Sequence, residues 1–140
     1  MEKNSSTNHI KGVKVKDLDV KRDDRGWFAE ILRGDEIDDP KFGQMYVTTA
    51  TVGQTKGKHY HNRKLEWFCV IAGKGLLTLV ENETGKREEI EMGENNMVTV
   101  EIPPGVWHAI ANTGDTDMFL IAHISEPYNP EDPDTIAREL

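Results

Sequence analysis

The chain has 140 residues, a formal net charge of −8 at pH 7 and 36% hydrophobic residues. This length suits one domain around a single core, and the negative charge argues against the basic face that a nucleic-acid-binding protein needs. The N-terminal sequence is polar and no apolar run approaches the roughly 20 residues of a membrane-spanning helix, so we expect a cytoplasmic protein without signal peptide or membrane contact. We expect residues 1–9 to be a disordered leader and residues 10–140 to form the domain.

Short β-rich runs separated by turn signals recur along the chain, as in an all-β sandwich or barrel. In chain order, the predicted strands are Val13–Val15, Trp27–Leu32, Gln44–Val52, Leu65–Ile71, Gly75–Glu81, Arg87–Met92, Met97–Ile102, Val106–Ala111 and Met118–Ile124. The run Glu83-Thr84-Gly85 is predicted to form a hairpin tip, where the glycine supplies a positive φ. The predicted helix is Asp134–Leu140, with Asp134 as its N-cap.

The predicted strand over residues 65–71 has two faces, because side chains alternate along a strand. One face carries Glu66, Phe68 and Val70, and the other carries Trp67, Cys69 and Ile71. With Glu66 inside the barrel, the outer face is an apolar patch, and such a patch usually marks an interface. We therefore expect a homodimer, with cover by residues of the same chain before residue 50 as the alternative. Cys69, the single cysteine, then acts as a packed hydrophobe rather than a nucleophile.

Three histidines and one carboxylate are the most informative residues of the chain. His59 and His61 are one residue apart, so on an extended chain their side chains point to the same side. Glu66 follows in an apolar run, where an unpaired carboxylate is costly, and His108 comes from a distant predicted strand. We predict that the four residues bind a divalent metal; a metal-free polar pocket of the same residues is the alternative. Because ligand histidines must be neutral, the metal should leave as the pH falls toward ~5–6.

Two segments, GQTKGKHYHNRKLEWFCVIAG and PPGVWHAIAN, resemble the two motifs of the cupin superfamily. The first segment matches at every framing position, whereas in the second Gly93 lies farther from Pro103 than the usual frame has it. The resemblance implies an all-β fold, the cupin double-stranded β-helix or jelly-roll barrel, with the pocket inside. The superfamily hosts many chemistries, so the fold alone does not identify the reaction.

A narrower resemblance links the chain to dTDP-4-dehydrorhamnose 3,5-epimerases, through DDRGWFAEIL near the start and Tyr128-Asn129-Pro130 near the end. It implies that His59 is the catalytic histidine, that Lys64 is a pocket lysine and that Tyr128 is the proton donor. It also implies that Arg25 binds the nucleotide diphosphate, and Arg63, beside His61, could steer the phosphates as well. A solvated strand end for Lys64, a surface aromatic for Tyr128 and a plain turn charge for Arg25 are the alternatives.

The chain resembles most specifically the C-terminal cupin domain of capsular polysaccharide enzymes that epimerise a UDP-linked 4-keto amino sugar. The residues that carry this likeness are the HxHxxKxE spacing from His59 to Glu66 and the segments NTGDTDM and NPEDPDT. This resemblance implies a bound zinc, with manganese, nickel or iron as alternatives. His61 and Glu66 favour this metal-bearing branch, because the rhamnose-type epimerases typically have glutamine at the position of His61. No counterpart of the reductase half is present, so we expect any following reduction to need a separate protein.

Three functions remain open at this point. The first is a nucleotide-sugar epimerase or isomerase acting on a 4-keto sugar in surface polysaccharide biosynthesis. The second is another metal-dependent cupin enzyme, such as a sugar-phosphate isomerase or a dioxygenase. The third is a cupin module that binds a sugar or nucleotide without catalysis.

Overall fold

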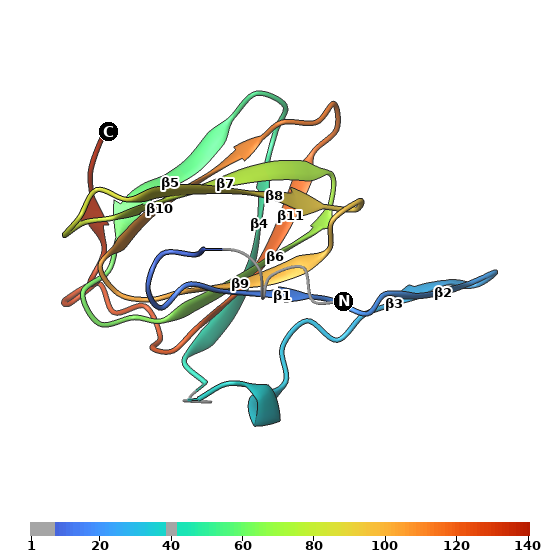
Figure 1. Cartoon of the computed structure of the whole chain (residues 1–140), viewed down its shortest axis with the longest axis horizontal. Helices are drawn as coiled ribbons and strands as arrows, with labels where there is room; N and C mark the ends of the chain where they lie inside the picture. Colours follow the sequence, from blue (N-terminus) through green and yellow to red (C-terminus); the bar gives the residue numbers. More distant parts are fainter. Residues whose placement is uncertain (1–7, 39–41) are drawn as a thin grey trace.

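The computed structural model describes residues 8–38 and 42–140, and its architecture is two antiparallel sheets of five strands that face each other (Figure 1). In spatial order, the first sheet contains β1 (Lys14–Asp17), β9 (Val98–Ile102), β6 (Glu66–Ala72), β11 (Met118–Ile124) and β4 (Gln44–Ala50). The second contains β12 (Ile136–Ala137), β5 (Thr55–Tyr60), β10 (Val106–Asn112), β7 (Lys74–Glu81) and β8 (Arg87–Gly93). A separate hairpin pairs β2 (Lys21–Asp23) with β3 (Gly26–Phe28), and a 3-10 turn, η2, covers Gly34–Glu36. The described residues contain no α-helix, and the all-β prediction is confirmed.

The inner faces of the two sheets enclose one hydrophobic core. Both sheets contribute to it, through Phe68 and Val70 of β6 and through Leu77 and Leu79 of β7. Removing these side chains from water stabilises the sandwich, at roughly 1.5–3 kcal/mol for each fully buried large apolar side chain. The predicted alternation along residues 65–71 is confirmed, since Phe68 and Val70 lie in the core whereas Trp67 and Cys69 lie on the opposite side of β6.

The outer face of β6 is covered by an earlier part of the same chain. Trp67 is 3% exposed and Cys69 is fully buried. The segment that precedes and includes η2 passes over this face, where Ile31 and Leu32 share an apolar groove with Trp67. The hydroxyl of Thr99 holds the segment by donating a hydrogen bond of 2.6 Å to the carbonyl of Ile31. The alternative prediction, cover by residues of the same chain before residue 50, thus applies to Trp67, whereas the thiol of Cys69 lies against Met97. The homodimer stays a prediction.

Most predicted strands are confirmed within two residues at either end. The predicted strand Trp27–Leu32 is an exception, because β3 already ends at Phe28. The strands β2, β5 and β12 were not predicted. The turn at residues 83–85 is confirmed, with φ of +77° at Gly85 between β7 and β8. The predicted helix Asp134–Leu140 is wrong. Ile136 and Ala137 pair with β5, so this segment's backbone hydrogen bonds go to a sheet.

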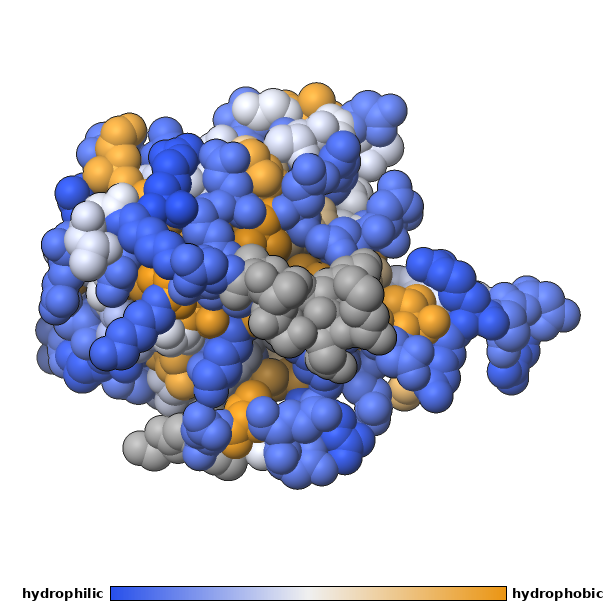
Figure 2. All heavy atoms as spheres, viewed as in Figure 1, coloured by the Kyte–Doolittle hydropathy of each residue, from blue (hydrophilic) through white to orange (hydrophobic). Residues whose placement is uncertain are grey.

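The hairpin of β2 and β3 extends away from the two sheets (Figure 1). Trp27 and Phe28 on it are 46% and 59% exposed. Figure 2, in the same view as Figure 1, shows a surface made mainly of hydrophilic residues, with hydrophobic residues in smaller patches among them. Within the described ranges, no helix is long and apolar enough to cross a membrane. Of the predicted leader, residues 1–7 lie outside the described residues, whereas His9 contacts Glu88 of β8.

Candidate metal centre

A bulge in β5 sets the direction of His59. In the pairing of β5 with β10, His59 lies opposite His108 while Gly57 lies opposite Ala109, so Lys58 is an extra residue. Lys58 has a φ of +64°, in the left-handed region that side chains other than glycine rarely adopt. Such bulges re-aim the neighbouring side chains. This one brings His59 to the face that carries His108.

Three of the four predicted metal ligands converge. One nitrogen from each of His59, His61 and His108 forms a group in which all three atoms lie within 4.8 Å of one another. The ring centres are 4.9 to 5.5 Å apart. His61 and His108 are 6% and 1% exposed, and His59 is partly exposed. Three imidazoles around a common point, with one side open, are a ligand set that suits zinc.

The fourth predicted ligand, Glu66, lies against two of these histidines. Its Oε1 atom is 2.9 Å from Nε2 of His61 and 3.0 Å from Nε2 of His108. These contacts have the distances of an ion pair but not the geometry of a hydrogen bond, so all three atoms are buried without a hydrogen-bond partner. Buried polar atoms that point at one another without bonding are costly. A cation between them would remove that cost, so the residues fit a metal.

The second ring nitrogen of His61 and that of His108 each lie against a backbone carbonyl. Nδ1 of His61 lies 2.6 Å from the carbonyl oxygen of Asp134, and Nδ1 of His108 lies 3.1 Å from that of Val106. A ring N–H that donates to a carbonyl leaves Nε2 with a free lone pair, and metal-binding histidines are usually oriented in this way. Both Nε2 atoms face Glu66, as described above.

Burial and mutual contacts shift the ionisation of the cluster. Burial, followed by the charges of His108 and His61, lowers the pKa of His59 to about 4. Burial opposes ionisation of Glu66, but contacts with His108 and His61 outweigh it and lower the pKa of this carboxyl. Burial lowers the pKa of His61, but the contact with the Glu66 carboxylate outweighs burial and raises this pKa. At neutral pH the site therefore holds a carboxylate and an uncharged His59.

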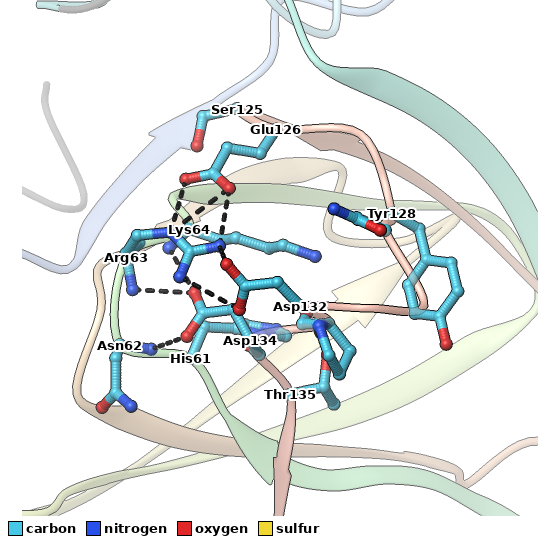
Figure 3. A network of polar contacts seen from close by, with 12 residues as sticks. His61, Asn62, Arg63, Lys64, Ser125, Glu126, Tyr128, Asp132, Asp134 and Thr135 are labelled. Carbon is cyan, nitrogen blue, oxygen red and sulfur yellow. Dashed lines mark hydrogen bonds and ion pairs between the residues drawn. The ribbon is translucent and has the colours of Figure 1, made fainter.

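Lys64 and Tyr128 lie together beside the cluster. Lys64 is 4% exposed, so the solvated strand end is excluded, and its Nζ atom lies 5.7 Å from the ring centre of Tyr128. Figure 3 shows the lysine side chain extended toward that tyrosine. Tyr128 itself is 58% exposed, and its backbone N–H donates to the side chain of Gln44 on β4. The amine of Lys64 and the ring of Tyr128 therefore lie close together, and Lys64 is near enough to His61 to influence its pKa.

The two predicted phosphate-binding arginines are placed differently. The guanidinium of Arg63 lies 3.0 Å from Glu126 and 3.3 Å from Asp132. Figure 3 shows the arginine beside both carboxylates. These carboxylates already occupy it. Arg25 lies on the hairpin that extends away from the sheets, paired with Asp23 at 2.6 Å. Within one chain, Arg25 is therefore not brought to the histidines.

Two residues near the cluster were not predicted as part of the site. Tyr46 of β4 pairs with Ala122, which is in the core, so its side chain points between the sheets. Burial and the charge of Glu66 raise the pKa of Tyr46 above its usual range. Asp134, predicted as a helix cap, instead contacts the loop that follows His61. The alternation of Gln44, Tyr46 and Thr48 was the available signal for Tyr46.

Sequence comparison relates the chain to proteins of polysaccharide and glycan biosynthesis. The family described as the polysaccharide biosynthesis C-terminal domain matches residues 21–136. The spore coat polysaccharide biosynthesis protein SpsL of Bacillus subtilis is 35% identical over 89% of this chain and 86% of its own length. A UDP-2-acetamido-2,6-beta-L-arabino-hexul-4-ose reductase of Pseudomonas aeruginosa is 36% identical over 86% of this chain, which spans 31% of that protein. A probable low-salt glycan biosynthesis epimerase of Haloferax volcanii is 29% identical over 90% of this chain and 85% of its own length.

Solved structures agree with the fold. A dTDP sugar isomerase from Desulfovibrio desulfuricans superposes with a TM-score of 0.85 at 21% identity, over 93% of this chain and 85% of its own. The capsular polysaccharide assembling protein CapF from Staphylococcus aureus gives 0.68 at 36% identity, over 88% of this chain and 34% of its own. The predicted cupin jelly-roll fold and the resemblance to capsular and dTDP-sugar enzymes are confirmed. The chain belongs to the family of the polysaccharide biosynthesis C-terminal domain.

Proposed function

We propose that the chain is a nucleotide-sugar epimerase or isomerase that acts on a 4-keto sugar in surface polysaccharide biosynthesis. The observation that carries the proposal is the convergence of His59, His61 and His108, with Lys64 and Tyr128 in contact with each other on the segments that adjoin His61. The relatives support it, since they include an epimerase and a reductase of sugars. A nucleotide sugar is the expected ligand, and nucleic acid and membrane are not expected partners.

In this proposal the three histidines hold one divalent metal, with Glu66 beside them. Zinc is the ion we expect, because imidazole nitrogen and carboxylate oxygen are common zinc ligands; manganese, nickel and iron are the alternatives. When bound, such an ion supplies positive charge that polarises a keto oxygen. The orphaned Nε2 atoms of His61 and His108 are the observation on which this assignment rests.

The remaining residues would handle protons. A hydrogen next to a sugar ketone is weakly acidic, so epimerisation needs a base, stabilisation of the enolate and a proton donor on the opposite face. Lys64 would donate a hydrogen bond to the enolate oxygen, and the phenol of Tyr128 would return a proton to carbon. Their closeness, 5.7 Å from Nζ to the ring centre, allows both to reach one sugar ring.

His59 has two alternative roles in this site. Its low pKa, about 4, keeps the imidazole uncharged at neutral pH, which is the form that both a ligand and a proton acceptor need. If His59 binds the ion, it cannot also take the proton at C3, and another group must do so. If His59 is free, it is the base, as in the rhamnose-type resemblance. Comparing His59→Ala with His61→Ala separates the two roles, because a ligand role predicts loss of metal in both variants.

The first experiment measures metal per chain in protein purified without chelator or a metal-affinity step. We expect about one zinc per wild-type chain and its loss in His61→Ala. The second follows solvent deuterium entering C3 of a UDP-linked 4-keto amino sugar, by mass spectrometry. Tyr128→Phe should lose the inverted product, resolved by nuclear magnetic resonance, because the proton donor on the opposite face is removed. Tyr60→Phe, which changes the tyrosine between the two histidines, is the matched control.

Other results would identify the alternatives. Binding of the nucleotide sugar without any exchange at C3 would indicate a non-catalytic binding module. Consumption of oxygen with iron bound would indicate a dioxygenase. Absence of metal from both wild type and His61→Ala would remove the metal from the proposal and leave His59 as the base on a rhamnose-type substrate.

A further inference from the structure

Asp134 has a backbone conformation that requires a compensating interaction. It is 8% exposed and has a φ of +49°, in the left-handed region where aspartate is one of the few tolerated side chains. Both carboxylate oxygens accept backbone hydrogen bonds. Oδ1 accepts from Asn62 at 2.9 Å, and Oδ2 accepts from Arg63 at 2.8 Å and Lys64 at 3.1 Å. One buried side chain therefore fixes three consecutive amides.

These three amides belong to the loop that joins the two halves of the site. The loop begins after His61 and ends before Glu66, and Lys64 lies within it. The carbonyl of Asp134 also accepts the ring N–H of His61 at 2.6 Å. The same residue thus holds the loop through its side chain and orients the histidine through its backbone. Figure 3 shows Asp134 between His61 and the loop.

The residues that follow Asp134 contact the other two histidine-bearing strands. We call residues 134–138 the C-terminal strap. Ala137 pairs with His59 in β12 and β5, and the N–H of Arg138 donates to the carbonyl of Lys58, the bulge residue. The indole N–H of Trp107, the neighbour of His108, donates to the carbonyl of Arg138 at 2.8 Å. The strap therefore accepts the ring N–H of His61, pairs with the backbone at His59 and accepts the indole N–H of Trp107 beside His108.

We propose that Asp134 is a positioning residue that makes the C-terminal strap part of the site, by fixing the ring of His61 with Nε2 toward the cluster and by fixing the loop that carries Lys64. Partners of this kind typically change metal affinity ~10–100-fold when they are removed. The inference deepens the proposed function, but its geometric part holds with or without a bound metal.

The test uses three variants of the full chain. Asp134→Gly removes the carboxylate while glycine keeps the left-handed backbone without strain. Asp134→Asn keeps the shape but can accept with only one oxygen, and serves if the glycine variant does not fold. Asp132→Asn is the matched control, because Asp132 lies two residues earlier and contacts the guanidinium of Arg63 instead of the loop backbone.

Two readouts decide the proposal. In metal-free protein, nuclear magnetic resonance should show a slowly exchanging ring N–H of His61 and protected amides at residues 62–64. Protection of the three amides should be lost in Asp134→Gly, reduced in Asp134→Asn and retained in Asp132→Asn. The ring N–H of His61 should exchange faster in Asp134→Gly, because the carbonyl that accepts it remains but the carboxylate that anchors residue 134 to the loop is gone. In zinc titrations against a chromophoric chelator, the dissociation constant should rise ~10–100-fold in Asp134→Gly and less than twofold in the control.

Persistent protection of amides 62–64 in Asp134→Gly, or an unchanged exchange rate of the His61 ring N–H, would overturn the proposal, as would an equal loss of zinc affinity in Asp132→Asn. Failure of the wild type to bind zinc would refute the metal of the proposed function instead, and the ring N–H would still decide whether Asp134 positions His61.

Discussion

Glu66 is a 3% exposed carboxylate between two imidazoles. Its ionised form is maintained by His61 and His108, so it either completes a metal site or forms a buried ion pair without one. We predict that Glu66→Gln, which keeps the shape but removes the charge, weakens zinc binding at least ~10-fold, the lower end of the effect of losing a partner in a metal site. Competition with a chromophoric chelator measures this, with the exposed Glu89→Gln as control. Unchanged affinity would show that the histidines bind the ion alone.

Cys69 is fully buried, and burial raises the pKa of its thiol to about 11. The unfolded chain releases the same proton near ~8.5. Between these two values the unfolded state binds fewer protons than the folded state, so stability falls as the pH rises. We predict that urea unfolding of the wild type loses up to ~1.4 kcal/mol per pH unit more than Cys69→Ala between pH 9 and 10.5. Parallel curves for the two proteins would contradict the burial argument.

At the scale of elements, Gly73 connects β6 to β7 at a point where two strands approach closely. Its φ is +82°, and a Cβ atom there would lie 2.6 Å from the carbonyl oxygen of Asp117. Gly85, in the turn between β7 and β8, has a φ of +77° but open space around it. The two glycines thus share the backbone conformation and differ in the space available.

We predict that Gly85→Ala costs about 1–2 kcal/mol, the penalty of the left-handed backbone for a side chain. Gly73→Ala should cost at least ~1 kcal/mol more, because the alanine methyl must also displace a backbone carbonyl. Urea denaturation of both variants measures the difference. Equal losses would mean that the chain near Asp117 moves aside at no cost.

The strands that the sequence did not predict are those whose conformation depends on the strand with which they pair. The strands with alternating or continuous apolar residues, such as β6 and β11, were predicted because their own side chains require burial. Most of β5 is polar and exposed, and its strand conformation depends on β10. Likewise, the bulge at Lys58 follows from pairing and is not encoded by a glycine at that position.

The same distinction applies to the site. His59, His61 and His108 were predicted as a group, because the spacing of two of them and the motif around the third fix which face they share. Asp134 was predicted as a helix cap, since an aspartate before a possible helix has that role locally. Its actual partners are three amides some seventy residues earlier in the chain, and only the folded barrel brings them together.

At the scale of the whole molecule, the group formed by the histidines and Glu66 is assembled from both sheets. His59 and His108 come from the second sheet, whereas Glu66 opens β6 of the first. The ion-pair contacts of Glu66 therefore cross between the sheets. Binding of a metal to this group should stabilise the sandwich as a unit, because the ion binds the folded arrangement and not the unfolded chain.

The predicted homodimer has a candidate surface on the outer side of β4 and β11. Met45, Val47 and Phe119 are 58%, 62% and 39% exposed, and the register of the two strands puts them on one face. The corresponding face of β6 is covered by its own chain, so this neighbouring patch is where a second copy would bury apolar area. We predict that Val47→Glu converts a dimer to a monomer in sedimentation velocity, whereas Thr116→Glu, an equal charge change in an exposed loop, does not. A wild type that sediments as a monomer would contradict the homodimer, and a dimeric Val47→Glu would place the interface on another surface, with the exposed hairpin of β2 and β3 next to be tested.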